Sequence, residues 1–99
     1  MFLREIAHSR TGDKGNIITL SLIAYRKGDY ATIEQQVTAE RVAEFFSGIV
    51  EGPVVRYSLP HLGALNFVLH RPETKTVTRS LALDVHGKCL SSALLGMEI

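Results

Sequence analysis

The sequence predicts an α+β domain in which helices pack on one face of a largely antiparallel sheet. Several short segments alternate apolar with polar residues, a pattern typical of strands with one buried face. Other segments place apolar residues at helical spacing instead. The chain has 99 residues, 45% of them hydrophobic, which is enough for one modest core. We therefore expect a single domain over residues 1–99.

The first part of the chain is predicted to form two strands joined by a turn. Residues 2–9 are expected to form the first strand, and Thr11–Asn16, with its two glycines, the turn. The run Ile17–Tyr25 is nearly continuous in apolar residues and rich in β-formers. Such a run favours a central strand that is covered on both faces.

Two helices are expected next. A short one follows from the helical spacing of three residues, Tyr30, Ile33 and Val37. The hydroxyl of Thr38 can then cap a second helix, with a clearer apolar stripe, by accepting from the free amides of its first turn. The apolar stripe of that helix consists of Val42, Phe45, Phe46 and Ile49. Gly48 and the Gly52–Pro53 pair are expected to end it.

The second half of the chain predicts three more strands and a helix. Val55–Leu59 and Leu65–Leu69 show strand alternation, and only five residues separate them. Because Pro60 and Gly63 lie between, a hairpin with a loop is the simplest arrangement. Leu81–Val85 alternates in the same way and predicts the last strand. Helical spacing returns in the tail at Leu90, Leu94 and Met97.

Charge and composition exclude several classes of protein. Eleven Lys and Arg against ten Asp and Glu give a net charge of +1, whereas nucleic-acid-binding proteins carry a strong basic excess. Cys89 is the single cysteine, which excludes an internal disulfide and a cysteine-based zinc site. The sequence has neither a leader-like start nor an apolar run of the ~20 residues that cross a membrane. We expect a soluble, cytoplasmic protein without nucleic-acid or membrane partners.

The four histidines are candidates for chemistry. A zinc site needs three or four such ligands together, but each histidine adjoins a different predicted element, so we expect neither a metal nor another cofactor. His8 and His61 adjoin predicted turns, and either could act as a general base near neutral pH. The alternative is an ordinary surface histidine, and no catalytic residue is assigned.

The stretch Arg10–Asn16 is the strongest candidate site. It combines two glycines with the cations Arg10 and Lys14, the acid Asp13 and the amide Asn16. Glycine permits a turn whose backbone amides point inward, and the cations would add charge, so the stretch could hold a phosphate or carboxylate. In the alternative, Asp13 itself accepts from the turn amides and both cations stay in solvent. The sequence leaves both interpretations open.

Asn66 is a further candidate binding residue. It lies on a predicted strand, on the face that it shares with Ala64 and Val68. A buried amide on an apolar face needs hydrogen-bond partners. We expect Asn66 either to pin a neighbouring loop or to point into a pocket.

The chain resembles the AtuA-like domain, the small C-terminal ferredoxin-like domain of acyclic terpene utilisation protein A and its relatives. The resemblance covers nearly the whole chain and is most specific in the motif Arg-x-Gly-Asp-Lys-Gly-Asn. The segments that carry it are Ile6–Asn16, Arg56–Pro60, Leu65–Leu69, Thr78–Leu81, Asp84–Lys88 and Leu94–Leu95.

The resemblance implies a variant of the ferredoxin-like fold and a setting in acyl-CoA breakdown of branched-chain or isoprenoid acids. It also implies a stand-alone small subunit that works with a larger, separately encoded AtuA-type subunit, and we expect a homo-oligomer as well. If the family's loop is a binding site, the positions that inherit it are Arg10, Asp13, Lys14 and Asn16, with Asn66 as a neighbour.

Three functions remain open at this point. In the first, the chain is an accessory subunit whose Arg10–Asn16 loop holds an anion at a subunit boundary. In the second, it is a self-contained homo-oligomeric enzyme that acts on acyl-CoA thioesters, with His8 or His61 as base. In the third, it is a purely structural interaction module and the loop is only a turn. The lack of a convincing catalytic group favours the accessory subunit over an independent catalyst.

Overall fold

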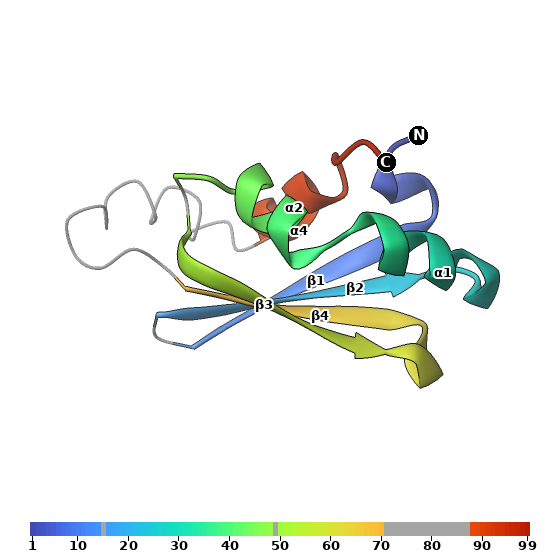
Figure 1. The fold of residues 1–99 in the computed structure, drawn as a ribbon, viewed down its shortest axis with the longest axis horizontal. Coiled ribbons are helices and arrows are strands. Elements are labelled where there is room, and N and C mark those ends of the chain that lie inside the picture. The colour runs from blue at the N-terminus through green and yellow to red at the C-terminus, as the bar shows by residue number, and fades with distance from the viewer. Residues whose placement is uncertain (15, 49, 71–87) are drawn as a thin grey trace.

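A four-stranded antiparallel sheet, with helices on one of its faces, forms the framework of the protein (Figure 1). The computed structural model describes residues 1–14, 16–48, 50–70 and 88–99. The predicted α+β class is confirmed within this part of the chain. The elements, in chain order, are η1 (Leu3–Glu5), β1 (Ala7–Lys14), β2 (Ile17–Ala24), α1 (Lys27–Gln36), α2 (Ala39–Phe45), β3 (Glu51–Leu59), η2 (Pro60–Leu62), β4 (Ala64–His70) and α4 (Lys88–Leu94).

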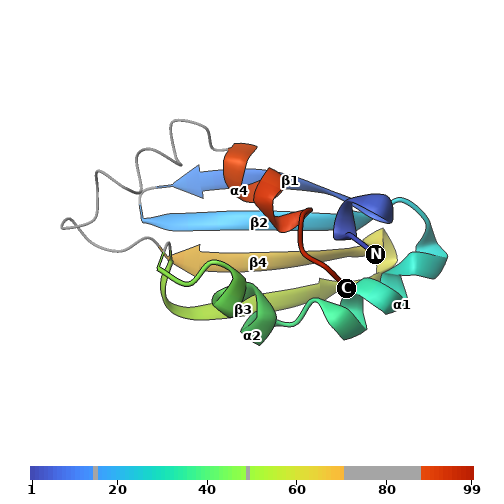
Figure 2. The ribbon, with the colours of Figure 1, turned by 90° about the horizontal axis from the view of Figure 1, so that it is seen from above.

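The strand order in the sheet is β1-β2-β4-β3, and each neighbouring pair is antiparallel. β2 and β4 are central. β1 and β3 form the two edges of the described sheet. Seen from above, α4 lies over the β1 side and α2 over the β3 side (Figure 2). The predicted strand Leu81–Val85 lies outside the described residues.

The core lies between the sheet and the helices. Strand side chains alternate between faces, so every second residue of β2 and β4 is buried beneath the helices. These residues are Ile18, Leu20 and Leu22 of β2 and Leu65, Phe67 and Leu69 of β4. The run Ile17–Tyr25 supplies a central strand, β2, as predicted, but the prediction that both its faces are covered is wrong, since Ile17 is 42% exposed and the described helices all lie on one side. Thr19 and Ser21 occupy the other face, where polar side chains can meet water.

The helix predictions are confirmed in part. The side chain of Thr38 accepts from the backbone N of Arg41 at 3.1 Å and caps α2 as expected. Val42 and Phe46 are buried, but Phe45, the last residue of α2, is 41% exposed. Phe45 instead contacts Phe46 edge-on, with ring centroids 5.1 Å apart. Ile49 lies outside the described residues.

The start of the chain differs from the prediction. Residues 2–9 are not one strand, because a 3-10 turn, η1, precedes β1. The Glu5 carboxylate accepts from the backbone N of Phe2 at 2.7 Å and stabilises this turn. The predicted turn Thr11–Asn16 is also wrong over most of its length. The ladder between β1 and β2 continues to the pair Lys14 and Ile17, so Thr11–Lys14 is strand.

The β3–β4 hairpin forms as predicted. Its connection is the 3-10 turn η2 followed by Gly63, whose φ of 60° lies in the left-handed region that glycine adopts readily. β3 is longer than expected and begins at Glu51. Gly52 and Pro53 therefore lie within this strand rather than merely ending a helix, and the pairing register shifts between Glu51 and Val55.

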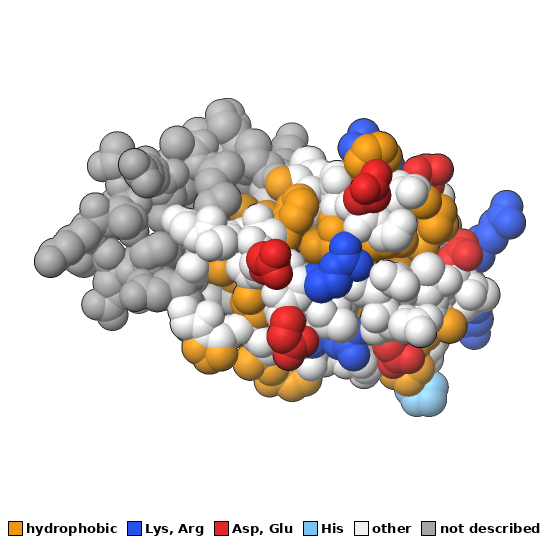
Figure 3. Space-filling view, turned by 45° about the horizontal axis from the view of Figure 1, so that its top comes forward, with side chains coloured by type: hydrophobic (Ala, Val, Ile, Leu, Met, Phe, Trp, Pro, Cys, Tyr) orange, Lys and Arg blue, Asp and Glu red, His pale blue; other side chains and the backbone are white. Residues whose placement is uncertain are grey.

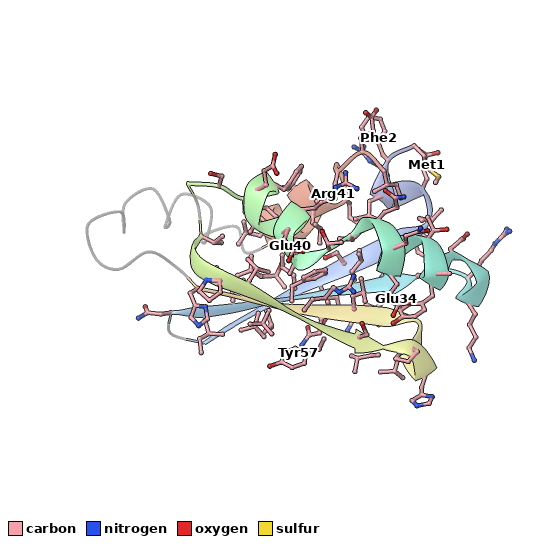
Figure 4. All side chains as sticks on the ribbon, in the orientation of Figure 1. Met1, Phe2, Glu34, Glu40, Arg41 and Tyr57 are labelled. Atoms are coloured by element: carbon pink, nitrogen blue, oxygen red, sulfur yellow. The ribbon has the colours of Figure 1, made fainter. Side chains whose placement is uncertain are left out.

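The first and last residues of the chain pair with each other on the helix side (Figures 1 and 2). Leu3 N donates to Met97 O at 2.9 Å, and Ile99 N donates to Met1 O at 2.8 Å. Arg41 of α2 lies near these ends (Figure 4) and its Nη2 donates to Glu98 O at 2.7 Å. Leu90, Leu94 and Met97 are all buried, as their spacing predicts.

Candidate functional site

The side of the sheet away from the helices, here called the open face, brings candidate residues together. Arg10 pairs with Ser21, Ser21 with Asn66, and Asn66 with Tyr57. Residues directly opposite in antiparallel strands project to the same face. These four residues therefore form one row across the sheet, which we call the polar row. Figure 4 shows Tyr57 on the side opposite to the helices, and 53% of its surface is exposed.

Asn66 lies at the centre of the polar row. It shares its face with Ala64 and Val68, as the strand alternation predicts. Ser21 Oγ donates to Asn66 Oδ1 at 3.2 Å, and this contact is partly buried. Asn66 thus bonds a neighbouring strand rather than the loop that the sequence suggested. The hydrogen bond fixes the orientation of the carboxamide, because its oxygen is held on the β2 side.

The predicted site residues of the first hairpin separate along the strand. Arg10 is exposed and belongs to the polar row. Asp13 and Lys14 are strand residues paired with Ile18 and Ile17, and their side chains lie outside the described part of the structure. Asn16 is exposed next to the turn. Of the five candidates, the structure places Arg10 and Asn66 in a common row.

Gly12 and Thr19 adjoin this row, and sequence reasoning missed their contact. Thr19 Oγ1 donates to the Gly12 carbonyl O at 3.3 Å. A Cβ added at Gly12 would come within 2.9 Å of that hydroxyl oxygen. The absence of a side chain at Gly12 thus makes room for the Thr19 hydroxyl on this face. Ser21 and Tyr57 were missed as well, since their role depends on the pairing register rather than on a local motif.

The two candidate histidines lie in different parts of the structure. His8 precedes Arg10 on the same face of β1 and stacks on Tyr25, with ring centroids 5.3 Å apart. His61 lies exposed in η2, on the β3–β4 connection. Within the described residues, no group of three His, Cys, Asp or Glu side chains is arranged to hold a metal ion.

A second polar group lies on the helix side of the sheet. Arg56 Nη1 donates to the backbone carbonyls of Glu34 at 2.6 Å and Val37 at 3.0 Å. Tyr30 Oη donates to Glu34 Oε2 at 3.1 Å. Burial, more than any neighbour, raises the pKa of the Tyr30 phenol above its ordinary value. These contacts join α1 to β3 and serve the fold.

A shallow hollow of about 230 Å³ lies on the helix side, lined by Arg41, Glu44, Phe45 and Met97. Figure 3 shows the helix side, where acidic, basic and apolar side chains are interspersed. The guanidinium of Arg41 is already bonded to Gln36 and Glu98. The hollow is therefore separate from the polar row and offers no comparable set of available donors.

The fold and the row of polar groups define a small α+β domain with one covered and one open sheet face. The sequence matches the AtuA ferredoxin-like domain family over residues 1–99. The chain belongs to that family. Neither a curated protein nor a solved structure matches it. None of the described helices combines the length and apolar character needed to cross a membrane.

Proposed function

We propose that this chain is the small subunit of an acyl-CoA-processing complex for branched-chain or isoprenoid acids, and that it works with a larger AtuA-type subunit. Its role in this proposal is accessory: residues of Arg10–Asn16, with Asn66, hold an anionic group of the substrate at the boundary between the subunits. Family membership supports the setting. The polar and exposed apolar side chains on the open face support the accessory role.

The observation that carries the proposal is the combination of polar and apolar groups on the open face. Arg10 and Asn66 share a row, and apolar side chains at the β3 edge remain substantially exposed, namely Val55 and Leu59 at 39% each, with Tyr57 at 53%. Contiguous exposed apolar surface of this kind marks interaction sites. A flat sheet face also encloses a small ligand poorly, because binding sites are usually concave. A larger subunit would supply the missing wall.

The β1 side of the open face favours an acidic or anionic occupant. His8, Arg10 and Gly12 are the described β1 residues on this face, and none is acidic. Arg10 thus contributes a positive charge to this side of the face, which attracts an acidic partner. A larger partner with acidic groups, or with a bound anionic substrate, fits this surface better.

Binding to a large AtuA-type subunit from the same genome tests the proposal. Purified subunits are mixed and followed by size-exclusion chromatography with light scattering, and the dissociation constant is measured by calorimetry. Tyr57→Glu should weaken the complex at least about tenfold, since it places a negative charge at an interface that faces acidic groups or an anion. Phe45→Glu is the matched control, because it puts the same charge at an exposed aromatic residue of the helix side. No complex, or loss of the complex only with Phe45→Glu, would contradict the proposal.

A self-contained homo-oligomeric enzyme is the alternative, and the position of His8 favours it. His8 is two residues from Arg10 on the same strand face, so a base and a cation would lie side by side. Hydrolysis of acyl-CoA thioesters by the isolated oligomer, abolished by His8→Ala, would support this function. For a purely structural module, Arg10→Gln and Lys14→Ala should change neither partner affinity nor the activity of the complex.

A further inference from the structure

The polar row is a set of side chains with hydrogen-bond donors that crosses all four described strands. Its members lie on four adjacent strands, with Arg10 and Tyr57 on the edge strands and Ser21 and Asn66 in the centre. Neighbouring strands are about 4.8 Å apart, so the row spans roughly 14 Å. Arg10 and Asn66 are two strands apart in this row, about 10 Å, so a ligand above Ser21 would lie between their two side chains.

The hydrogen bond from Ser21 decides what Asn66 presents to a ligand. Because Asn66 Oδ1 accepts from Ser21 Oγ, one of the two lone pairs of this oxygen is occupied. The two N–H groups of Nδ2 have no side-chain partner among the described residues, and Asn66 is only partly buried. The part of the carboxamide that Ser21 leaves free therefore presents two donors and one remaining lone pair. The centre of the open face is therefore complementary to an acceptor.

Arg10 adds a positive charge to these donors. No carboxylate pairs with its guanidinium within the described part of the chain, and the residue is exposed. Guanidinium groups bind carboxylate and phosphate oxygens with two parallel hydrogen bonds. Gly12, the next residue on this face of β1, has no side chain, and the hydroxyl of Thr19 lies beside it.

The geometry points to an oxyanion site at the centre of the open face, distinct from the tip of the first hairpin. Asn66 Nδ2 and the Arg10 guanidinium bind the oxygens, and Ser21 is a positioning residue that orients the Asn66 amide. The site deepens the proposed function and rests on it for its biological setting, since it assigns the anion-holding role to the sheet rather than to a loop. Its ligand is a carboxylate or a phosphate, and the two share the same acceptor chemistry.

Nuclear magnetic resonance of the isolated chain tests the site without any partner. Sodium phosphate and sodium acetate are titrated separately, at constant pH and ionic strength, while side-chain N–H signals are recorded. We expect saturable shifts of the Asn66 Nδ2 pair and of the Arg10 Nε–H signal. A response to phosphate alone identifies a phosphate site, a response to acetate alone a carboxylate site, and a response to both a general oxyanion site. No saturable shift with either salt, or shifts confined to the backbone around Asn16, would overturn the inference.

Substitutions can distinguish the residues that bind the anion, Asn66 and Arg10, from Ser21, which positions the Asn66 amide. Asn66→Asp keeps an acceptor for Ser21 but replaces the donors with a charged oxygen, so binding should be abolished. Arg10→Gln should weaken binding about tenfold, whereas Arg26→Gln, the same charge change at an exposed residue before α1, should not.

Ser21→Ala should weaken binding severalfold and make the two Asn66 Nδ2 hydrogens exchange faster with water, because the amide loses its anchor. Ser21→Thr retains the hydroxyl and should restore both properties. Unchanged affinity and exchange in Ser21→Ala would contradict the positioning role. This experiment is independent of the large-subunit assay, so an oxyanion site without a complex, or a complex without an oxyanion site, tells the two proposals apart.

Discussion

The guanidinium of Arg56 on β3 donates to the backbone carbonyl of Glu34 in the last turn of α1, across 2.6 Å. The last carbonyls of a helix have no partner within the helix itself. Arg56 supplies one to Glu34 and another to Val37, the C-cap residue. An edge strand of the sheet thus completes the end of a helix that contributes a single buried residue, Ile33.

Loss of Arg56 should therefore destabilise the whole domain. Arg56→Ala removes two charge-assisted hydrogen bonds, and we expect the free energy of unfolding to fall by about 2–3 kcal/mol. Arg56→Lys should fall between wild type and the alanine variant, because an ammonium lacks the planar fork. Urea unfolding followed by circular dichroism measures both. Arg26→Ala is the control, and an equal loss for Arg26→Ala would show that charge alone is responsible.

The Tyr30 phenol should make stability depend on alkaline pH. Burial raises its pKa above the ordinary 10.0 in the folded state, so the folded protein binds this proton more tightly than the unfolded chain. The stabilising contribution is complete below the unfolded pKa and is lost as pH rises through the folded pKa. Subtracting the phenolate absorbance of Tyr30→Phe from that of wild type should give a midpoint above 10.0. A midpoint at or below that value would refute the expectation.

The contact between Gly12 and Thr19 predicts a coupled pair. Gly12→Ala places a Cβ against Thr19 Oγ1, and we expect a loss of about 1–2 kcal/mol from crowding. In the Thr19→Ala background the obstructing oxygen is gone, so Gly12→Ala should be neutral or stabilising there, since alanine loses less backbone entropy. A double-mutant cycle from urea unfolding should give a coupling of at least about 0.5 kcal/mol. Simple additivity would contradict the proposed contact.

The tail of the chain should contribute to stability through Met97 rather than through Glu98. Met97 is 3% exposed within the core, and Met97→Ala should cost about 2–5 kcal/mol. Glu98 is exposed and is held by its carbonyl O, which accepts from Arg41. Glu98→Ala keeps that carbonyl and should change stability by less than about 0.5 kcal/mol. Thermal unfolding of both variants provides the comparison, and similar losses would show that Met97 is not specifically packed.

The sequence predicted the parts of this fold that depend on local pattern. The cap at Thr38, the buried Val42 and the β3–β4 hairpin all follow from residues close together in the chain. The coverage of β2 could not be predicted in the same way. Its apolar run suggested two covered faces, but the partners of Ile17 and Ile23 are set by the layer arrangement, which brings the described helices to the other side of the sheet.

The candidate site was predicted less completely, for a related reason. Arg10 and Asn66 were singled out separately, from a motif and from strand alternation. Their common row depends on the pairing of three strands, which no local signal specifies. The same pairing register places Ser21 and Tyr57 in the polar row. Nothing in the sequence distinguishes these two from other strand residues. The ladder between β1 and β2 continues to Lys14, so Gly12 is a strand residue and most of the predicted turn is strand.

The adjacent chain ends also determine how this domain can be attached to another protein. Both ends leave at one place on the helix side, directly against each other. A host polypeptide joined at either terminus, or at both, would be tethered through a single pivot. The open face lies on the opposite side of the sheet, away from the point of attachment. The linker would therefore leave it accessible to the host protein.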